Sequence, residues 1–267
     1  SNTGIQTKPH MDISAQGDIF IVWEDTRDSI GHEQIYGSFS SDGMNFDEAV
    51  RISDTSIDYY CFDPSVAWSG NEDIHVVWTE DRIIDTDIRF CSSDDSGDTF
   101  SSSFILNRDP SSSDQDSAFI DANSTSVVVV WKDGRSTSAD IYMAISSDGG
   151  SSFAMEFVVH PSFKTGHQYD PEMLIESDGN ISVCWTSSPG RDDTSKSDIQ
   201  MTKYLVNGTF EEVETVNDRK IGISQDNPSL AVSKGMAHIA WADYRNNNQP
   251  DIYFSRTISY GEEGEAP

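Results

Sequence analysis

Five tryptophans recur at an almost constant interval, and this repeat constrains the fold more than any other feature of the chain. Each of them ends a short apolar run (IFIVW, IHVVW, VVVVW, ISVCW and AHIAW), and the runs are separated by 55, 53, 54 and 56 residues. The residues are Trp23, Trp78, Trp131, Trp185 and Trp241. A fixed period of this length is typical of architectures in which one supersecondary unit is repeated and packs against its neighbours. The chain therefore contains five copies of one unit.

The second copy shows the internal order of the unit. Apolar, β-branched runs cover Pro64 to Ser69, Ile74 to Trp78, Asp87 to Cys91 and Phe104 to Asn107, with turn residues between them. Such runs predict four short antiparallel strands. No window has the sustained 3.6-residue apolar period of a helix. Four strands about every 54 residues predict a β-propeller blade, so we expect an all-β, five-bladed propeller that forms a single domain over residues 1–267.

The two ends of the chain bear on how such a ring would close. The last copy has no fourth strand, because only a polar tail at residues 258–267 follows its third strand. Gly4 to Thr7 precedes the first strand of the first unit, just as the fourth strand of each other unit precedes the first strand of the unit after it. We therefore expect this N-terminal strand to complete the C-terminal blade, which would remove an open sheet edge.

Charge excludes one class of partner. The chain has 46 acidic and 17 basic residues, a formal net charge of −29. Nucleic acids are bound through clustered Lys and Arg, so a surface this acidic argues against them. No apolar run approaches the roughly 18 residues of a membrane helix. We expect a monomeric domain of a larger chain, without nucleic-acid binding or membrane insertion.

A motif between the third and fourth strands carries a family resemblance. Ser93 to Phe100 (SDDSGDTF) and Ser146 to Phe153 (SSDGGSSF) resemble the Asp box, S-x-D-x-G-x-[ST]-[WF], of sialidase-like (BNR repeat) propellers, and Ser40 to Phe46 is a shortened form. A carboxylate in such a turn accepts backbone N–H groups and a glycine supplies a positive φ. The residues with this structural role are Asp42, Asp95, Gly97, Asp148 and Gly150. The resemblance implies that these boxes lie opposite the functional face.

A second motif, W-x-D-x-R, begins at the repeated tryptophan in most units. It resembles the repeat of secreted or surface BNR-type proteins, which implies an extracellular or cell-surface location. The loops that follow the tryptophans contain four arginines, and we expect them at the usual ligand-binding end of a propeller. We expect two tyrosines beside them. These candidate ligand-binding residues are Arg27, Arg82, Arg135, Arg245, Tyr169 and Tyr244. The alternative is structural: each Arg forms a local ion pair with the Asp two residues before it.

Four aspartates occupy one position at the start of the first strand, fifteen residues before the tryptophan. They are Asp63, Asp116, Asp170 and Asp226, while Lys8 takes this position in the first unit. Because Ca²⁺ prefers several converging carboxylate oxygens, a ring of these side chains predicts a calcium site. The alternative is plain turn chemistry, since Asp63-Pro64 and Asp170-Pro171 are common at the start of a strand.

These observations predict a noncatalytic binding module that recognises a glycan or a surface protein through the face with the Asp/Arg loops, with Ca²⁺ as its candidate cofactor. The alternative is a sialidase-like glycoside hydrolase, which in that family clamps the substrate carboxylate with three arginines and uses a Tyr activated by Glu as nucleophile. The family's Phe/Tyr-Arg-Ile-Pro signature is absent, because Thr7-Lys8-Pro9-His10 stands in its place. Three converging arginines would favour catalysis, and arginines each bonded to their own Asp would argue against it.

Overall fold

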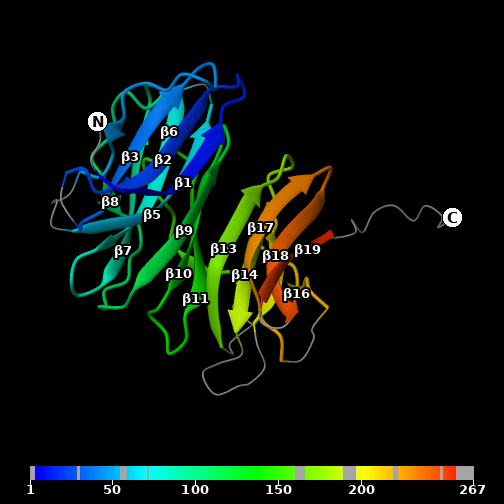
Figure 1. Cartoon of the computed structure of the whole chain (residues 1–267). Helices are drawn as coiled ribbons and strands as arrows, with labels where there is room; N and C mark the ends of the chain where they lie inside the picture. The colour runs from blue at the N-terminus through cyan, green and yellow to red at the C-terminus, as the bar shows by residue number, and fades with distance from the viewer. Residues whose placement is uncertain are drawn as a thin grey trace. The chain divides into compact units, whose positions relative to one another are not determined.

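The computed structural model describes residues 4–28, 31–54, 59–70, 72–159, 166–188, 197–218, 222–246 and 249–256. Every regular element in these ranges is a β-strand, as Figure 1 shows. The all-β prediction is therefore confirmed. None of the described residues forms a helix that could cross a membrane.

The strands form five antiparallel sheets, each made of consecutive strands of one repeat. The first sheet contains β1 (Gln6–Ile13), β2 (Ile19–Asp25), β3 (Gln34–Ser40) and β4 (Val50–Arg51). The second contains β5 (Tyr60–Ser69), β6 (Asp73–Asp81), β7 (Thr86–Ser93) and β8 (Phe104–Ile105). The third contains β9 (Gln115–Ala122), β10 (Val127–Asp133), β11 (Asp140–Ser146) and β12 (Phe157–Val158). The fourth contains β13 (His167–Ile175), β14 (Ile181–Ser188), β15 (Asp198–Tyr204) and β16 (Glu214–Thr215). The fifth contains β17 (Gln225–Ser233), β18 (Met236–Asn246) and β19 (Gln249–Arg256).

The first strand of every sheet contains a bulge, and this makes the strands longer than the sequence pattern predicts. In the second sheet the register with β6 shifts between Phe62 and Ser65, and Asp63 has a φ of 51°. The Asp-Pro pair thus does not start the strand, because the bulge absorbs one residue and pairing continues on both sides. As a result β5 begins at Tyr60 rather than at Pro64.

The same feature corrects the prediction for the N-terminal strand. Gln6 and Thr7 pair with Asp25 and Glu24 of β2, and the Ile5 carbonyl accepts the N–H of Thr26. Gly4 to Thr7 therefore does not complete the C-terminal blade: its described backbone bonds run to the first sheet, on the far side of the bulge. The fifth sheet has three strands within the described residues.

The chain divides into two compact units, Ser1–Val159 with the first three sheets and His160–Pro267 with the last two. Closure of all five sheets into one five-bladed ring, in a single domain, stays a prediction. The predicted polar tail at 258–267 lies outside the described residues.

In the first unit, apolar clusters fill the spaces between successive sheets. Phe20 and Val22 of β2 pack with Val66 of β5 and Trp78 of β6 in one cluster. A second cluster joins the second sheet to Ile120 and its neighbours in the third sheet. The first strands are also linked by side chains, since the Val66 N–H donates to His10 Nδ1 at 3.1 Å.

The second unit repeats this arrangement between its own two sheets. Cys184 and Ile199 of the fourth sheet share a cluster with Leu230 and Trp241 of the fifth. The Leu230 N–H donates to Glu172 Oε2 at 2.7 Å, which is the counterpart of the His10 link. Four of the five repeated tryptophans are core residues: Trp78, Trp131 and Trp185 are fully buried and Trp241 is 5% exposed, whereas Trp23 is half-buried.

Candidate functional site

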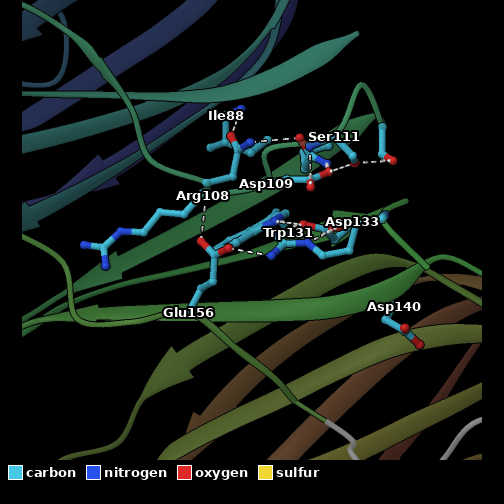
Figure 2. Close-up of polar contacts among 12 residues, drawn as sticks. Ile88, Arg108, Asp109, Ser111, Trp131, Asp133, Asp140 and Glu156 are labelled. Carbon is cyan, nitrogen blue, oxygen red and sulfur yellow. Dashed lines mark hydrogen bonds and ion pairs between the residues drawn. The ribbon is translucent and has the colours of Figure 1, made fainter.

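The W-x-D-x-R motif forms a closed cluster of side chains, which Figure 2 shows in the third sheet. The Trp131 indole N–H donates to Asp133 Oδ2 at 2.9 Å. Arg135 Nε and Nη2 donate to the two oxygens of the same carboxylate, at 2.8 and 2.6 Å, and its guanidinium lies 4.3 Å from the Tyr142 ring centroid. Arg135 Nη1 also donates to Glu156 Oε1 at 2.6 Å. We call this Trp–Asp–Arg–Tyr arrangement the clasp.

The clasp recurs in the first and fifth sheets. Asp25 and Asp243, both fully buried, accept Arg27 and Arg245 through two guanidinium nitrogens each. These guanidinium groups lie 4.1 and 3.9 Å from the centroids of the tyrosine rings in the adjacent strand. Burial alone would raise the pKa of Asp25, but hydrogen bonds from Arg27 and Trp23 hold this pKa at about 2. Arg245 donates to both oxygens of Asp243, whereas both Arg27 nitrogens donate to Asp25 Oδ2. These hydrogen bonds and the stacking on a ring fix each guanidinium within its own sheet.

The second and fourth sheets depart from this arrangement. Glu80 replaces the aspartate and accepts Arg82 Nε at 2.6 Å, and Arg89 takes the place of the tyrosine. In the fourth sheet Ser187 replaces the acid, and the Trp185 indole donates to Gln168 instead, at 2.6 Å. Arg191 of this unit lies outside the described residues.

Each of the four candidate arginines is therefore bonded to a carboxylate of its own sheet. The ion pairs that the sequence offered as the structural alternative are present. The guanidinium N–H groups that donate to this carboxylate are not available to a ligand carboxylate. The geometry favours a structural role, and a ligand-binding role for these arginines stays a prediction.

The two candidate tyrosines lie in the second unit and are both half-buried. Burial raises the pKa of Tyr169, although a hydrogen bond with Ser197 opposes this shift. The Tyr244 N–H donates to the Ser224 carbonyl at 3.1 Å, next to the clasp of Arg245. Their role in ligand binding stays a prediction.

The four aspartates predicted at the start of the first strands lie at or next to the bulges of these strands. In two repeats, however, the aspartate that stands fifteen residues before the tryptophan is not the bulge residue itself but the residue before it. The bulge residue with positive φ is Asp63 in the second sheet and Asp170 in the fourth, but Ser117 in the third and Asn227 in the fifth. Asp116 and Asp226 instead precede this residue and pair with the second strand. Asn and Asp tolerate the left-handed region better than most residues. Turn chemistry therefore accounts for Asp63, Asp170 and Asn227 at the bulge positions.

Two of these aspartates already have cationic partners. Lys8 forms an ion pair with Asp63, and Lys132 Nζ lies 2.8 Å from Asp116 Oδ2. Among the described residues, no three His, Cys, Asp or Glu side chains gather closely enough to hold a metal ion. Asp170 and Asp226 belong to the other unit, so a calcium site made by all four stays a prediction.

An open pocket of about 340 Å³ lies between the second and third sheets, at the end where the Asp/Arg loop and the bulges meet. It is lined by Phe62, Asp63, Asp81, Ile83, Ile84, Asp85, Thr86, Asp114 and Asp116. Five of these are carboxylates, while Ile83 and Ile84 are 87% and 78% exposed. Ile83 has a φ of 84°, which is rare for a β-branched side chain. We call this site the acidic pocket.

Sequence reasoning singled out two aspartates of this pocket, Asp63 and Asp116, but neither its other three aspartates nor its apolar rim. The signal is present, because two isoleucines follow Arg82 directly, whereas Asp-Ser follows the motif arginine in the first unit and Ser-Thr follows it in the third. Pattern reasoning treats isolated exposed isoleucines in a loop as unremarkable. Only the structure shows that Ile83 and Ile84 line the same pocket as Asp114, which lies just before β9.

The Asp-box turns lie at the other end of these strands. Asp95 Oδ1 accepts the Thr99 N–H at 2.9 Å, and the Gly97 N–H donates to Ser93 Oγ at 2.9 Å. Asp148 and Gly150 make the same bonds in the third sheet, and Asp42 accepts two backbone N–H groups in the first. Since β7 runs from Thr86 in the acidic pocket to Ser93 in the box, the two features occupy opposite ends of one strand.

No protein-family profile matches the chain, and no curated protein sequence matches it. Solved structures do match. The K499G mutant of NanB sialidase from Streptococcus pneumoniae has a TM-score of 0.59 at 10% identity, over 94% of this chain and 58% of that one. The intramolecular trans-sialidase from Ruminococcus gnavus has a TM-score of 0.60 at 10% identity, over 97% and 82%. An N-acetylgalactosamine deacetylase from F. plautii, in complex with blood group B trisaccharide, has 0.55 at 12%, over 91% and 82%.

The chain thus spans a little over half the length of the NanB sialidase. At these identities the similarity concerns the fold, which is that of a sialidase-like β-propeller, as the Asp-box resemblance implies.

Proposed function

We propose that this chain is a noncatalytic glycan-binding module of the cell exterior, and that its ligand occupies the acidic pocket. The observation that carries the proposal is the pocket itself, at the end of the sheets where the Asp/Arg loop and the bulge residues meet. Its volume of about 340 Å³ is within the range of small-ligand sites. The proteins of similar fold whose descriptions name a sialidase or a trisaccharide complex support a carbohydrate as the ligand class.

The chemistry of the lining determines which glycan fits. Carboxylates accept charge-assisted hydrogen bonds from hydroxyl groups, and Ile83 and Ile84 offer apolar contact to the C–H face of a sugar ring. Lys8 and Lys132 pair with two of the five carboxylates, Asp63 and Asp116. The other three would repel an anionic sugar, because like charges brought close together destabilise a complex. The expected ligand is therefore a neutral or amino-bearing glycan, rather than a sialic acid.

The clasp is the reason for proposing binding without catalysis. A sialidase-type site needs arginines that are available to the substrate carboxylate, whereas Arg27, Arg135 and Arg245 each donate two guanidinium nitrogens to a buried Asp. The alternative, a sialidase-like hydrolase, is favoured by the similarity to sialidase structures. It predicts release of sialic acid from a sialylated substrate.

The test is a binding screen with immobilised neutral, amino-bearing and sialylated glycans, together with a sialic-acid release assay. Asp85→Asn with Asp114→Asn removes two charges from the pocket, and we expect at least a tenfold loss of affinity for the bound neutral glycan. Asp94→Asn with Asp98→Asn makes the same charge change in the exposed Asp-box turn and should leave affinity unchanged. Equal affinity of the two variants, or release of sialic acid, would overturn the proposal.

Calcium remains a separate question with its own measurement. EDTA-treated protein is melted with and without millimolar Ca²⁺ at fixed ionic strength, since a cation that binds only the folded state raises the melting temperature. A rise of several degrees that disappears in Asp63→Asn with Asp116→Asn would establish calcium at these aspartates. An unchanged melting temperature would leave them as turn residues.

A further inference from the structure

The interface between the first and second sheets contains a carboxylate and a cation at its bulges. Glu24, the residue after the repeated tryptophan, accepts the N–H of Asp63 at 2.9 Å through Oε1. Its Oε2 accepts the Thr7 hydroxyl at 2.8 Å. The ammonium group of Lys8 lies 3.8 Å from Glu24 Oε1 and pairs with Asp63. At this interface the protein thus supplies its own ammonium group to its own carboxylates.

The interface between the second and third sheets has neither group at the equivalent positions. Thr79 of β6 takes the position of Glu24, since each follows the repeated tryptophan and pairs with an isoleucine of the third strand. Asp63 takes the position of Lys8, because both are bulge residues with positive φ. A short hydroxyl therefore replaces the long acid, and a carboxylate replaces the cation. The acidic pocket lies at this interface.

Two hydroxyl groups beside the pocket have no partner. Thr79 is fully buried and Thr86 half-buried, and the Oγ1 atom of each is buried without a hydrogen bond to any described residue. Thr79 lies on the same face of β6 as Asp81 and pairs with Phe62, while Asp81 pairs with Thr86. Phe62, Asp81 and Thr86 all line the pocket. Because buried polar atoms are nearly always hydrogen-bonded, these two hydroxyls indicate a polar ligand at this place.

The charge of the lining indicates that this ligand is a cation. Two of the five carboxylates have lysine partners, but Asp81, Asp85 and Asp114 form no ion pair within the described part of the chain. The acidic groups there are too far apart to hold a metal ion, and Ca²⁺ needs about six to eight converging oxygens. An ammonium group has three N–H donors, which can reach separate acceptors. The lining therefore suits an organic ammonium better than a metal.

We propose that the acidic pocket recognises its ligand through a protonated primary amine, which on a glycan is the amine of an amino sugar. This inference rests on the proposed function, since it takes the pocket as the glycan site and names the group that is bound. The ammonium group takes the role that Lys8 has at the neighbouring interface. Acetylation removes the charge of the amine, so the pocket distinguishes the free amine from its N-acetyl form.

Titration calorimetry with three matched sugars tests the proposal. The probes are the β-1,4-linked tetrasaccharides of glucosamine, N-acetylglucosamine and glucose, at a pH at which the amine is protonated. We expect the glucosamine probe to bind at least tenfold more tightly than the other two. Asp85→Asn with Asp114→Asn should abolish this preference, because an amide accepts hydrogen bonds without carrying charge. Asp94→Asn with Asp98→Asn is the matched control and should retain the preference.

The unpartnered hydroxyls give a second test. Thr79→Val with Thr86→Val keeps the branched shape and removes both oxygens. Since neither oxygen has a protein partner, the melting temperature should not fall, whereas affinity for the glucosamine probe should fall at least threefold. Thr186→Val is the control: Thr186 also follows a repeated tryptophan and is fully buried with an unpartnered hydroxyl, but it lies in the second unit. It should leave affinity unchanged.

The outcomes separate this inference from the proposed function. Equal affinity for the glucosamine and glucose probes would overturn the inference and leave a glycan-binding pocket. Binding of Nα-acetyllysine methylamide, lost in Asp85→Asn with Asp114→Asn, without binding of any sugar would support the ammonium site and overturn the glycan function. Binding of none of these probes would overturn both.

Discussion

At the scale of single residues, the glycines of the Asp-box turns have two separate reasons to be glycine. Gly97 has a φ of 90°, and a Cβ built on it would lie 2.1 Å from Cε2 of Phe20 in the neighbouring sheet. Gly150 repeats this against Phe90, at 2.6 Å from Cζ. The turn therefore supplies a flat surface for an aromatic ring of the preceding sheet as well as a left-handed backbone.

Comparing two glycine substitutions separates these reasons. Gly17 also has a positive φ, of 93°, but a Cβ there meets nothing within 4 Å. We expect Gly17→Ala to cost about 1–2 kcal/mol, the price of the left-handed backbone, and Gly97→Ala to cost a further 1–3 kcal/mol, roughly the range for overpacking. Urea unfolding of both variants measures the difference. Equal costs would mean that Phe20 moves aside freely.

The buried carboxylate of the clasp gives the protein an acid-sensitive element. The folded-state pKa of Asp25, about 2, lies below its ordinary value of 3.8. A lowered pKa contributes stability above the unfolded value, and this contribution is lost as the pH falls through the folded value. Asp25 should thus contribute about 2 kcal/mol at neutral pH, to order of magnitude, which disappears between about pH 4 and pH 2.

Urea unfolding from pH 7 to pH 2 checks this expectation. The unmodified chain should lose stability steeply below pH 4, and Asp25→Asn, which lacks the titrating group, should start lower and show a shallower decline. Parallel curves for the two proteins would show that Asp25 does not contribute.

At the scale of elements, an asparagine just after the fourth strand ties the second sheet to the third and the fourth sheet to the fifth. Asn107 Oδ1 accepts the N–H of Ile88 at 2.8 Å, and its Nδ2 donates to Asp87 and Gln115 at 2.9 and 2.8 Å. Asn217 makes the equivalent contacts in the second unit. In these two sheets the bonds account for the Asp-Ile pair that opens the third strand, since the Asp holds the asparagine that receives the Ile N–H.

Removing this asparagine should destabilise either unit. Asn107→Ala removes the hydrogen bonds to the buried Ile88 N–H and to Gln115 Oε1, so we expect a cost of about 1–3 kcal/mol. Asn217→Ala should cost a similar amount, because it loses the same contacts. Thermal unfolding of the two variants provides the measurement, and a change below about 0.5 kcal/mol in both would contradict the linking role.

At the scale of the whole molecule, the excess of 29 negative charges opposes the compact state. The Debye length shortens from about 30 Å at 0.01 M salt to about 3 Å at 1 M, so added NaCl should raise the melting temperature of dilute protein. Chloride is preferred to sulfate, because excluded salts strengthen apolar burial by a separate route. A melting temperature that stays constant over this range would show that the carboxylates are already locally compensated.

The sequence by itself determined the repeat, the all-β class and the turn chemistry, because these depend on local periodicity and on which residues tolerate a given φ. It placed Trp131, Asp133 and Arg135 in one motif and correctly offered an ion pair as one of their roles. It misassigned Gly4 to Thr7, and it aligned Asp116 and Asp226 one residue away from the bulge, because a bulge changes register without changing composition.

Only the tertiary structure decided the rest. The acidic pocket joins Ile83 and Ile84 of the second repeat to Asp114, which lies just before β9 of the third sheet. Such a site depends on contacts between residues far apart in the chain. Local sequence patterns do not specify these contacts, because they form only when one sheet packs on another.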